Sequence, residues 1–350
     1  MATTDQRLLC STSAPRPREL PPDLPRGRAR AIQQANAKWV NGTVLRYYFF
    51  DGDVEPSWAG ADDQKEAVRE AFQKWLEVGI GLGFKEVSDR SEAELRIGFL
   101  DGDGSWSYIG RQNLGIGKDE RTMNFGWDLT TSDGATTALH EIGHALGMPH
   151  EHQNPFAGIV WNEEAVYASL ASPPNSWPRE STFHNILRKL TADEVSGSNW
   201  DPDSVMEYAF GPGMIVEPAQ FRAGVNPPGT ISPMDAKWIS TWYPGGAPAP
   251  KAIKPFISVP LSLSAGQQAD FAISPPESRN YTLATFGVSD TVIVLFEEVD
   301  GELRHVAGDD DSGTDDNASL SLKLFRERNY VLRVRLQWAG GSGETAVMYW

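Results

Sequence analysis

The chain has little cysteine, a deficit of basic charge and no long apolar run. Cys10 is the single cysteine among 350 residues, which excludes an intramolecular disulfide framework. The 31 Lys and Arg residues are outnumbered by 47 Asp and Glu residues, giving a formal charge of -16 that argues against nucleic acid as a partner. No apolar run reaches the length that spans a bilayer, so we expect no membrane span. The first residues, MATTDQR, do not begin a secretory signal.

Composition changes along the chain indicate several segments. Residues 1–37 are rich in Pro and Arg and predict an extended arm or the remnant of a pro-segment. Gly, Pro and Ala dominate the start of 246–255, which we interpret as a linker. The linker would separate a mixed domain at 38–245 from a domain of short alternating strands at 256–350.

The segment His140–His150 reads HEIGHALGMPH and carries the main functional signal. Residues four apart lie on one face of a helix, so His140 and His144 can present ring nitrogens to one ion while Glu141 projects beside it. Gly147 can take the left-handed conformation that ends the helix and brings His150 to the same ion. Three protein ligands leave a fourth position for water, which is typical of a catalytic zinc site.

The helix that carries these residues should extend over 136–146. Apolar residues recur there at helical spacing, and either Ser132 or Asp133 could serve as the N-cap. His152, Gln153 and Asn154 follow the motif and could orient the ligating imidazoles by hydrogen bonds, although a solvated loop is an equal alternative.

Three further features resemble the astacin-like branch of the metzincin peptidases. These are Glu151 directly after the third histidine, the Ser-x-Met-x-Tyr spacing of Ser204, Met206 and Tyr208 within a segment that resembles the Met-turn of metzincins, Asp201–Tyr208, and the segment Ser105–Arg111 ahead of the zinc helix. Astacins usually have cysteine where Ser105 stands, and histidine where Glu207 stands.

The resemblance implies a role for each matching residue. It implies zinc ligation by His140, His144 and His150, with Glu141 as general base and acid. It implies that Met206 forms the apolar floor below the metal, and that Tyr208 stabilises the oxyanion. Taken alone, Met206 and Tyr208 would be read as core residues. Gly147, Met206 and Glu151 would support the site structurally.

The fold class expected is α+β, followed by an all-β sandwich. Strands at 44–49 and 94–99, a helix at 61–78 and the zinc helix would form a twisted sheet with helices, above a loop-rich lower lobe that closes with a helix at 234–243. Beyond the linker, strands at 281–286, 291–296, 319–324 and 330–336 predict the sandwich, which resembles the pre-peptidase C-terminal domain of bacterial peptidases.

Two possible sites have a simpler interpretation that we favour. Asp309–Asp311 could bind Ca²⁺ through carboxylates, but a solvated acidic turn is the preferred reading. Cys10 could block zinc as a thiolate, but an incidental surface thiol is preferred because no switch motif surrounds it.

The sequence therefore predicts a zinc endopeptidase that cleaves proteins or peptides and acts as a monomer. Zinc would supply a water of lowered pKa, from which Glu141 takes a proton. A zinc amidase acting on a non-protein amide and a catalytically inactive binding protein of the same fold are the alternatives. We expect a secreted or extracellular protein despite the missing signal, with a cytoplasmic location as the alternative.

Overall fold

The computed structural model describes residues 9–11, 38–39, 41–190, 199–245, 250–264, 267–299, 301–337 and 342–350. Most of the predicted arm 1–37 and residues 246–249 of the predicted linker lie outside the described residues. Contacts divide the chain into two compact units. One contains most residues up to Trp238, and the other contains Ile239–Trp350 together with two short stretches of the earlier chain.

The first unit is built on a five-stranded sheet in the order β2-β1-β3-β5-β4. The β1–β3 and β3–β5 pairs are parallel, whereas β4 runs antiparallel to β5 and forms one edge. The predicted strands near 44–49 and 94–99 are confirmed as β1 and β3. The strands are β1 Val44–Phe49, β2 Gly83–Glu86, β3 Leu95–Gly98, β4 Trp106–Ser107 and β5 Met123–Asn124.

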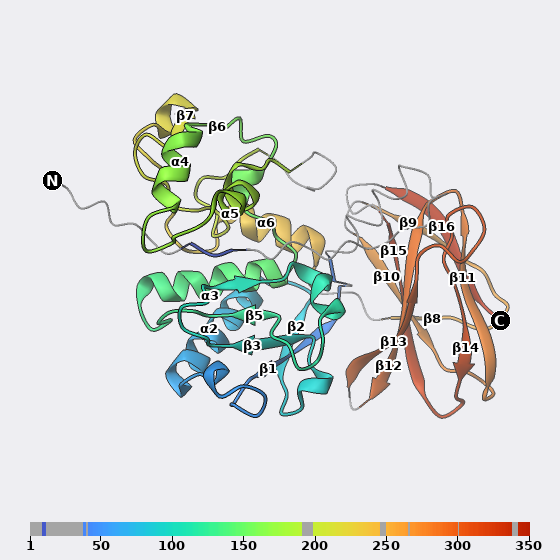
Figure 1. The fold of residues 1–350 in the computed structure, drawn as a ribbon. Coiled ribbons are helices and arrows are strands. Elements are labelled where there is room, and N and C mark those ends of the chain that lie inside the picture. Colours follow the sequence, from blue (N-terminus) through green and yellow to red (C-terminus); the bar gives the residue numbers. More distant parts are fainter. Residues whose placement is uncertain are drawn as a thin grey trace. The chain divides into compact units, whose positions relative to one another are not determined.

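Two long helices, α2 (Asp62–Glu77) and α3 (Ser132–Ala145), pack against each other beside this sheet (Figure 1). The ring of Phe72 on α2 stacks on Tyr47 of β1 at 4.5 Å between centroids. Trp75 is fully buried, and its indole Nε1 donates to the carbonyl of Leu139 on α3 over 3.1 Å. These contacts fix α3, which carries the metal motif, relative to the sheet.

The lower lobe has little regular structure, as predicted, and it follows α3. Its own core consists of aromatic and aliphatic side chains, including Val166, Ile186 and Phe210. Its elements are β6 Val160–Trp161, α4 Glu163–Leu170, α5 Arg179–Thr182, the π-helical η5 Phe183–Leu187, β7 Ile215–Glu217 and α6 Pro233–Trp242. Short 3-10 helices are η1 Pro56–Trp58, η2 Arg90–Glu92, η3 Gly110–Gly115, η4 Glu151–Gln153 and η6 Ala219–Phe221.

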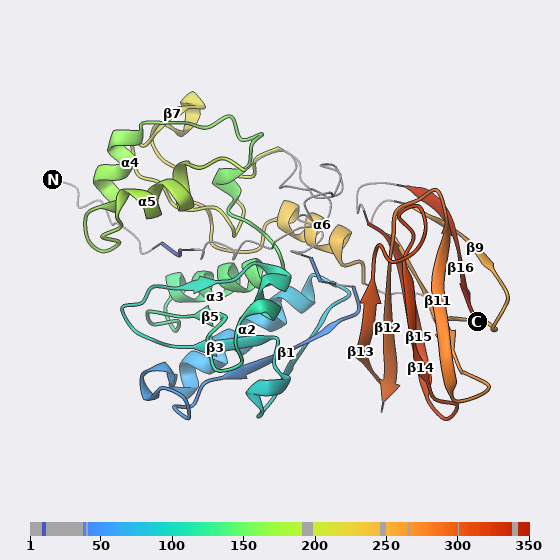
Figure 2. The same cartoon turned by 45° about the vertical axis from the view of Figure 1, so that its right-hand side comes forward.

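The second unit contains a β-sandwich, shown in Figure 2. One sheet has the order β13-β12-β15-β10-β8 and the other has the order β14-β11-β16-β9. Alternating side chains of both sheets form one buried core, in which Tyr281, Leu295 and Leu332 participate. The strands are β8 Lys251–Ala252, β9 Val259–Leu263, β10 Gln268–Ile273, β11 Arg279–Gly287, β12 Thr291–Val299, β13 Glu302–Asp309, β14 Ser319–Leu324, β15 Asn329–Leu336 and β16 Gly343–Tyr349.

The α+β class with a C-terminal sandwich is confirmed. Strand β8 pairs with β10, so residues that we assigned to the linker contribute to a sheet. Among the described residues, no helix combines the length and apolar composition that crossing a bilayer requires.

Candidate metal centre

Helix α3 presents His140 and His144 on one face, as the spacing predicts. The predicted N-cap is wrong by at least one residue: Thr131 caps the helix, and its hydroxyl accepts a hydrogen bond from Gly134 N at 3.0 Å. Gly147 has φ +104°, which is a left-handed conformation available to glycine, and it turns the chain toward His150. All three histidines are buried.

Backbone carbonyls orient two of the three imidazoles. Nδ1 of His140 lies 2.8 Å from the Val205 carbonyl, and Nδ1 of His144 lies 2.7 Å from the Met148 carbonyl. A carbonyl can only accept, so each Nδ1 carries the proton and each Nε2 is left with its lone pair. Burial lowers the pKa of His140 to about 4 and those of His144 and His150 well below the ordinary value, so the rings are neutral as ligation requires.

The donor set fits a zinc ion. Nε2 of His144 and Nε2 of His150 are 3.2 Å apart, close to the separation of about 3.3 Å that a tetrahedral site with Zn–N near 2.0 Å demands. Lone pairs that face one another at this distance repel unless a cation lies between them. Ligand atoms of His140, His144, His150 and Cys10 all lie within 4.8 Å of one another, and no other such group occurs in the part of the chain that the structure describes.

Glu141 lies beside these donors with its carboxylate fully buried. Apart from an interaction with the Cys10 thiol, which acts to lower the pKa of Glu141, neither carboxylate oxygen has a hydrogen-bond partner among the described residues. Burial raises its pKa well above the ordinary value. A buried carboxyl with no other partner next to three neutral imidazoles has the chemistry of a proton acceptor for a ligand at the metal.

Met206 packs directly under the metal helix. A Cβ added at Gly143 would lie only 2.4 Å from Met206 Sδ, so the glycine in the middle of α3 is what allows this close approach. Glycine in a helix interior costs about 1 kcal/mol relative to alanine, and that cost is the signal in the sequence that a neighbour must come close. The motif HEIGHALGMPH contains Gly143 but does not by itself assign it a role.

Asp235 stabilises the Met-turn by hydrogen bonds, a role that was not predicted from the sequence. Its buried carboxylate accepts from Ser204 Oγ at 2.6 Å and from the backbone N–H groups of Val205 and Ser232 at 2.8 and 2.9 Å. The Ser232 hydroxyl in turn accepts from Asp235 N at 2.9 Å. The pattern Ser-x-x-Asp before the apolar part of α6 is that of a capping box, which could have indicated this interaction.

Replacement of Asp235 by alanine is expected to lower the free energy of unfolding by about 2–4 kcal/mol, because three buried donors lose their acceptor. Val205 also supplies the carbonyl that orients His140, so zinc affinity should fall as well. Urea unfolding and zinc titration measure the two effects. Asp203→Ala removes an exposed carboxylate of the same turn and is the control; equal stability of the two variants would contradict this role.

Tyr208 directs its phenol to the same point as the histidines. Its oxygen lies 2.6 Å from Nε2 of His150, and its ring packs against His150 and His152 with centroids 4.5 and 4.7 Å apart. The phenol donates to the carbonyl of Cys10 at 2.7 Å. Tyr208 is therefore a buried residue of the metal site and not only of the lower-lobe core.

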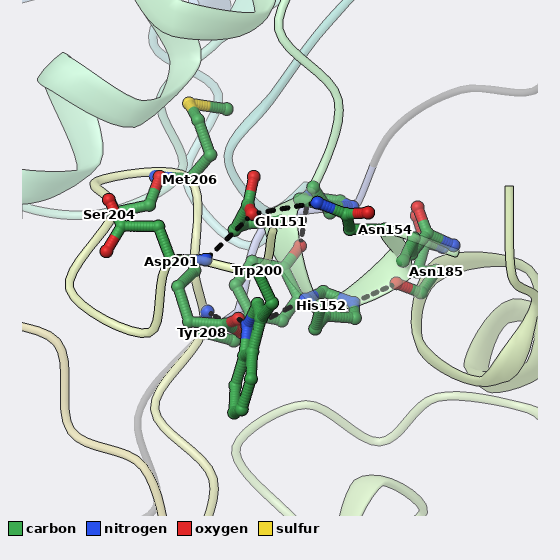
Figure 3. Close-up of polar contacts among 12 residues, drawn as sticks. Glu151, His152, Asn154, Asn185, Trp200, Asp201, Ser204, Met206 and Tyr208 are labelled. Carbon is green, nitrogen blue, oxygen red and sulfur yellow. Dashed lines mark hydrogen bonds and ion pairs between the residues drawn. The ribbon is translucent and has the colours of Figure 1, made fainter. Parts of the chain in front are cut away.

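Glu151 and His152 connect the third ligand loop to the rest of the lower lobe (Figure 3). Glu151 Oε1 accepts from Asp201 N at 3.0 Å and from Asn154 Nδ2 at 3.1 Å. Burial raises the pKa of Glu151 to about 8. His152 Nε2 lies 2.8 Å from the Asn185 carbonyl.

The prediction that residues 152–154 orient the ligating imidazoles holds only in part. Backbone carbonyls orient His140 and His144, whereas a side-chain hydrogen bond from Gln153 acts on His150. The alternative of a solvated loop is wrong, since all three residues are buried.

Glu207, between Met206 and Tyr208, accepts hydrogen bonds from Trp200 Nε1 and from Tyr208 N. Its carboxylate therefore stabilises the turn itself.

The prediction that Cys10 is an incidental surface thiol is wrong. It is not a surface thiol: it is 4% exposed, and its Sγ lies 3.2, 3.6 and 3.1 Å from Nε2 of His140, His144 and His150. In both views the short stretch 9–11 passes between α3 and the lower lobe (Figures 1 and 2). Leu9 and Cys10 line a cavity of about 460 Å³ together with residues of α3 and the Met-turn.

A buried His₃ centre on a helix, an adjacent carboxylate and a methionine floor together define the class of zinc-dependent metzincin peptidases. Comparison with known families agrees: the model of the Astacin peptidase family matches residues 31–211, slightly more than half of the chain. The chain belongs to the astacin family, and its peptidase domain is that of a zinc metalloendopeptidase.

Individual relatives are distant. The structure of myroilysin is 31% identical, with a TM-score of 0.53, over 60% of this chain and 97% of that one. Protein SpAN of Strongylocentrotus purpuratus is 29% identical over 166 residues, or 44% of this chain. The match covers 23% of SpAN, so the chain spans about a quarter of that relative.

The similarity of the β-sandwich to solved structures is weaker than that of the peptidase domain. The pre-peptidase C-terminal domain of a collagenase from Bacillus anthracis aligns with 30% of this chain at 15% identity and a TM-score of 0.25. This similarity is too low to show a common fold, so the resemblance of residues 256–350 to the pre-peptidase C-terminal domain stays a prediction. Nothing described at Asp309–Asp311 supports the calcium site: the carboxylate of Asp309 accepts hydrogen bonds from Ser312 and Ser319 within its own turn region.

Proposed function

We propose that the whole chain is an endopeptidase in which Glu141 is the general base and acid and Tyr208 stabilises the oxyanion. The observation that carries the proposal is that three imidazole nitrogens and a phenol meet at one point, while the buried carboxylate of Glu141 lines the same cavity and interacts with the Cys10 thiol at that point. These groups are the parts that hydrolysis of an amide by an activated water requires.

His140, His144 and His150 would hold the ion. When bound, zinc lowers the pKa of a water toward about 7 and polarises the carbonyl of the scissile bond. Glu141 would then accept a proton from that water and deliver it to the leaving amine. Its buried position, which raises its pKa, suits both steps because the carboxyl must hold the proton between them.

Tyr208 would act after the carbonyl has been attacked. Its hydroxyl can donate, and in this structure it already donates to a peptide carbonyl, that of Cys10. A substrate carbonyl in the same place would receive the same hydrogen bond. The cavity between α3 and the Met-turn is the place for the substrate chain, and its volume of about 460 Å³ accommodates several side chains.

The function is tested by incubating the chain with unfolded casein. Because Cys10 lies at the metal position, both the wild type and Cys10→Val are assayed. We expect Cys10→Val to cleave internal peptide bonds, a chelator to abolish cleavage, and one equivalent of Zn²⁺ to restore it. Zinc binding without cleavage of any protein or peptide would favour the amidase or the inactive binding protein.

A further inference from the structure

We propose that Asp133 and Asp128 select substrates that carry a lysine or arginine side chain next to the scissile bond. Both residues line the substrate cavity where α3 begins, and their carboxylates would bind the cationic head of that side chain. This inference rests on the proposed peptidase function, because it names the class of substrate that the same cavity accepts.

The charged side chains that line the cavity are acidic. Among the described residues, four of those lining it are Asp or Glu, and none is Lys or Arg. Two of the four have other roles: Glu141 lies beside the metal donors, and the carboxylate of Glu207 accepts two hydrogen bonds in the region of the Met-turn. Asp128 and Asp133 are therefore the carboxylates that remain for a substrate.

Helix α3 sets the distance between Asp133 and the reaction. Asp133 precedes His140 by seven residues, or about two helical turns, so the two residues lie on the same face about 10 Å apart along the axis. A substrate residue next to the scissile bond has its Cα close to the metal, so only a long side chain extends to Asp133. Lysine and arginine are the side chains that combine this length with a positive charge.

The walls of the cavity suit the aliphatic stem of such a side chain. Trp127 and Pro227 supply apolar surface. The indole Nε1 of Trp127 donates to Thr137 Oγ1 at 3.1 Å, and Thr136 Oγ1 donates to the carbonyl of Gly229 at 3.1 Å, so both walls are tied to α3. A Cβ at Gly229 would lie only 2.4 Å from Thr136 Oγ1, so glycine is required there. A stem on apolar surface with its charged head beside a carboxylate is the arrangement that lysine and arginine favour.

Both carboxylates are exposed, and a substrate can reach them. Oδ1 of Asp128 accepts from Gln64 Nε2 at 2.9 Å and from Thr130 N at 2.8 Å, and these donors lower the pKa of Asp128 and keep it ionised. Among the described residues, no hydrogen bond or ion pair involves the carboxylate of Asp133. A substrate cation would therefore gain a partner at Asp133 without displacing another residue.

The rival explanation is that Asp133 only stabilises the start of α3. It is the acidic residue of the first helical turn, where a negative charge interacts favourably with the helix dipole. The hydroxyl of Thr131 already caps this end of the helix. A dipole role predicts that replacing Asp133 changes stability and leaves substrate selection unaltered, whereas contact with the substrate predicts that selection changes.

A peptide-library cleavage profile tests the proposal in the wild type and in Cys10→Val, the two proteins assayed on casein. We expect Lys and Arg to be enriched about fivefold to tenfold over Gln and Met at one of the two positions that flank the scissile bond, the size expected for solvated charge pairs. Added salt should reduce the enrichment. A profile with no basic preference at either flanking position would overturn the proposal.

Two substitutions of Asp133 test its role with a matched pair of peptides that differ only by Lys or Gln at the selected position. Asp133→Asn should lower the ratio of their kcat/KM values about fivefold, and Asp133→Lys should make a Glu peptide the better substrate. Asp62→Asn removes an acid from the first turn of α2, outside the cavity, and should leave the ratio unchanged. Urea unfolding checks the fold of each variant. An unchanged ratio in both folded Asp133 variants would overturn its role.

Peptide binding to Glu141→Gln separates this inference from the proposed function, because calorimetry with the Lys and Gln peptides measures selection without turnover. Selective binding of the Lys peptide, with no cleavage by any protein that retains Glu141, would contradict the peptidase assignment and support the selection of a basic side chain. Cleavage without preference for a basic side chain would support the peptidase and remove Asp128 and Asp133 from substrate recognition.

Discussion

Glu141→Gln in the Cys10→Val background is expected to bind zinc, keep its fold and lose kcat by on the order of 10²- to 10⁴-fold. Glutamine has almost the same shape, but it cannot accept a proton from water and return it to the amine. The three imidazoles are oriented from elsewhere, two of them by the carbonyls of Val205 and Met148, so metal affinity should change little.

Kinetics with a quenched fluorescent peptide and the zinc content of the purified protein measure the two expectations. Glu163→Gln, a loss of the same charge at an exposed position of α4, controls for the change in net charge. A variant at Glu141 that contains zinc and keeps more than about a tenth of the parental kcat would contradict the assignment.

The removal of a buried charge also has a consequence for stability. The carboxylate of Glu141 is fully buried, and Cys10→Val removes the thiol that interacts with it, so the ionised form is costly in the folded parent. Glutamine carries no charge, so the variant should unfold at an equal or higher urea concentration than its parent. Loss of activity with retained or increased stability is the pattern expected of a catalytic group, since activity and stability often oppose each other at such sites.

Local features of the sequence were sufficient for the zinc helix, for helices α2 and α6 and for some of the strands. The spacing of His140, Glu141 and His144 depends on helix periodicity alone, and Gly147 needs only its own backbone freedom. Strand β3 follows from the alternation of Leu95 and Ile97 with other residues, whereas β1 and β15 follow from runs rich in aliphatic and aromatic residues. Each of these signals lies within about ten consecutive residues.

Contacts between segments that are far apart in the sequence could not be predicted from such local patterns. Cys10 is 130 residues from His140, and nothing near it in the sequence marks it as a ligand. Asp235 is 31 residues from Ser204, whose turn it stabilises. β13 was missed because its side chains are largely exposed and show no apolar alternation. A residue whose role depends on a long-range contact has no local periodicity to reveal it.

Tyr208→Phe in the Cys10→Val background is expected to lower kcat by on the order of 10²-fold and to change KM little. Phenylalanine keeps the ring that packs against His150 and His152, so the lower lobe and the metal site should remain intact. Only the hydroxyl is lost, and it would donate to the oxyanion in the transition state and not to the bound substrate. A hydrogen bond made only after attack lowers the barrier without improving ground-state binding.

The measurement is a full saturation curve, so that kcat and KM are separated, together with zinc content and urea unfolding to confirm the fold. Tyr167→Phe, which removes the hydroxyl of a half-buried tyrosine on α4, is the matched control and should leave kcat unchanged. Unchanged kcat in Tyr208→Phe would reduce Tyr208 to a packing residue. A rise in KM at constant kcat would instead place its hydrogen bond in the substrate complex. The same substitution in the wild-type background removes the hydrogen bond to the Cys10 carbonyl, so it should also loosen residues 9–11 and speed alkylation of the thiol.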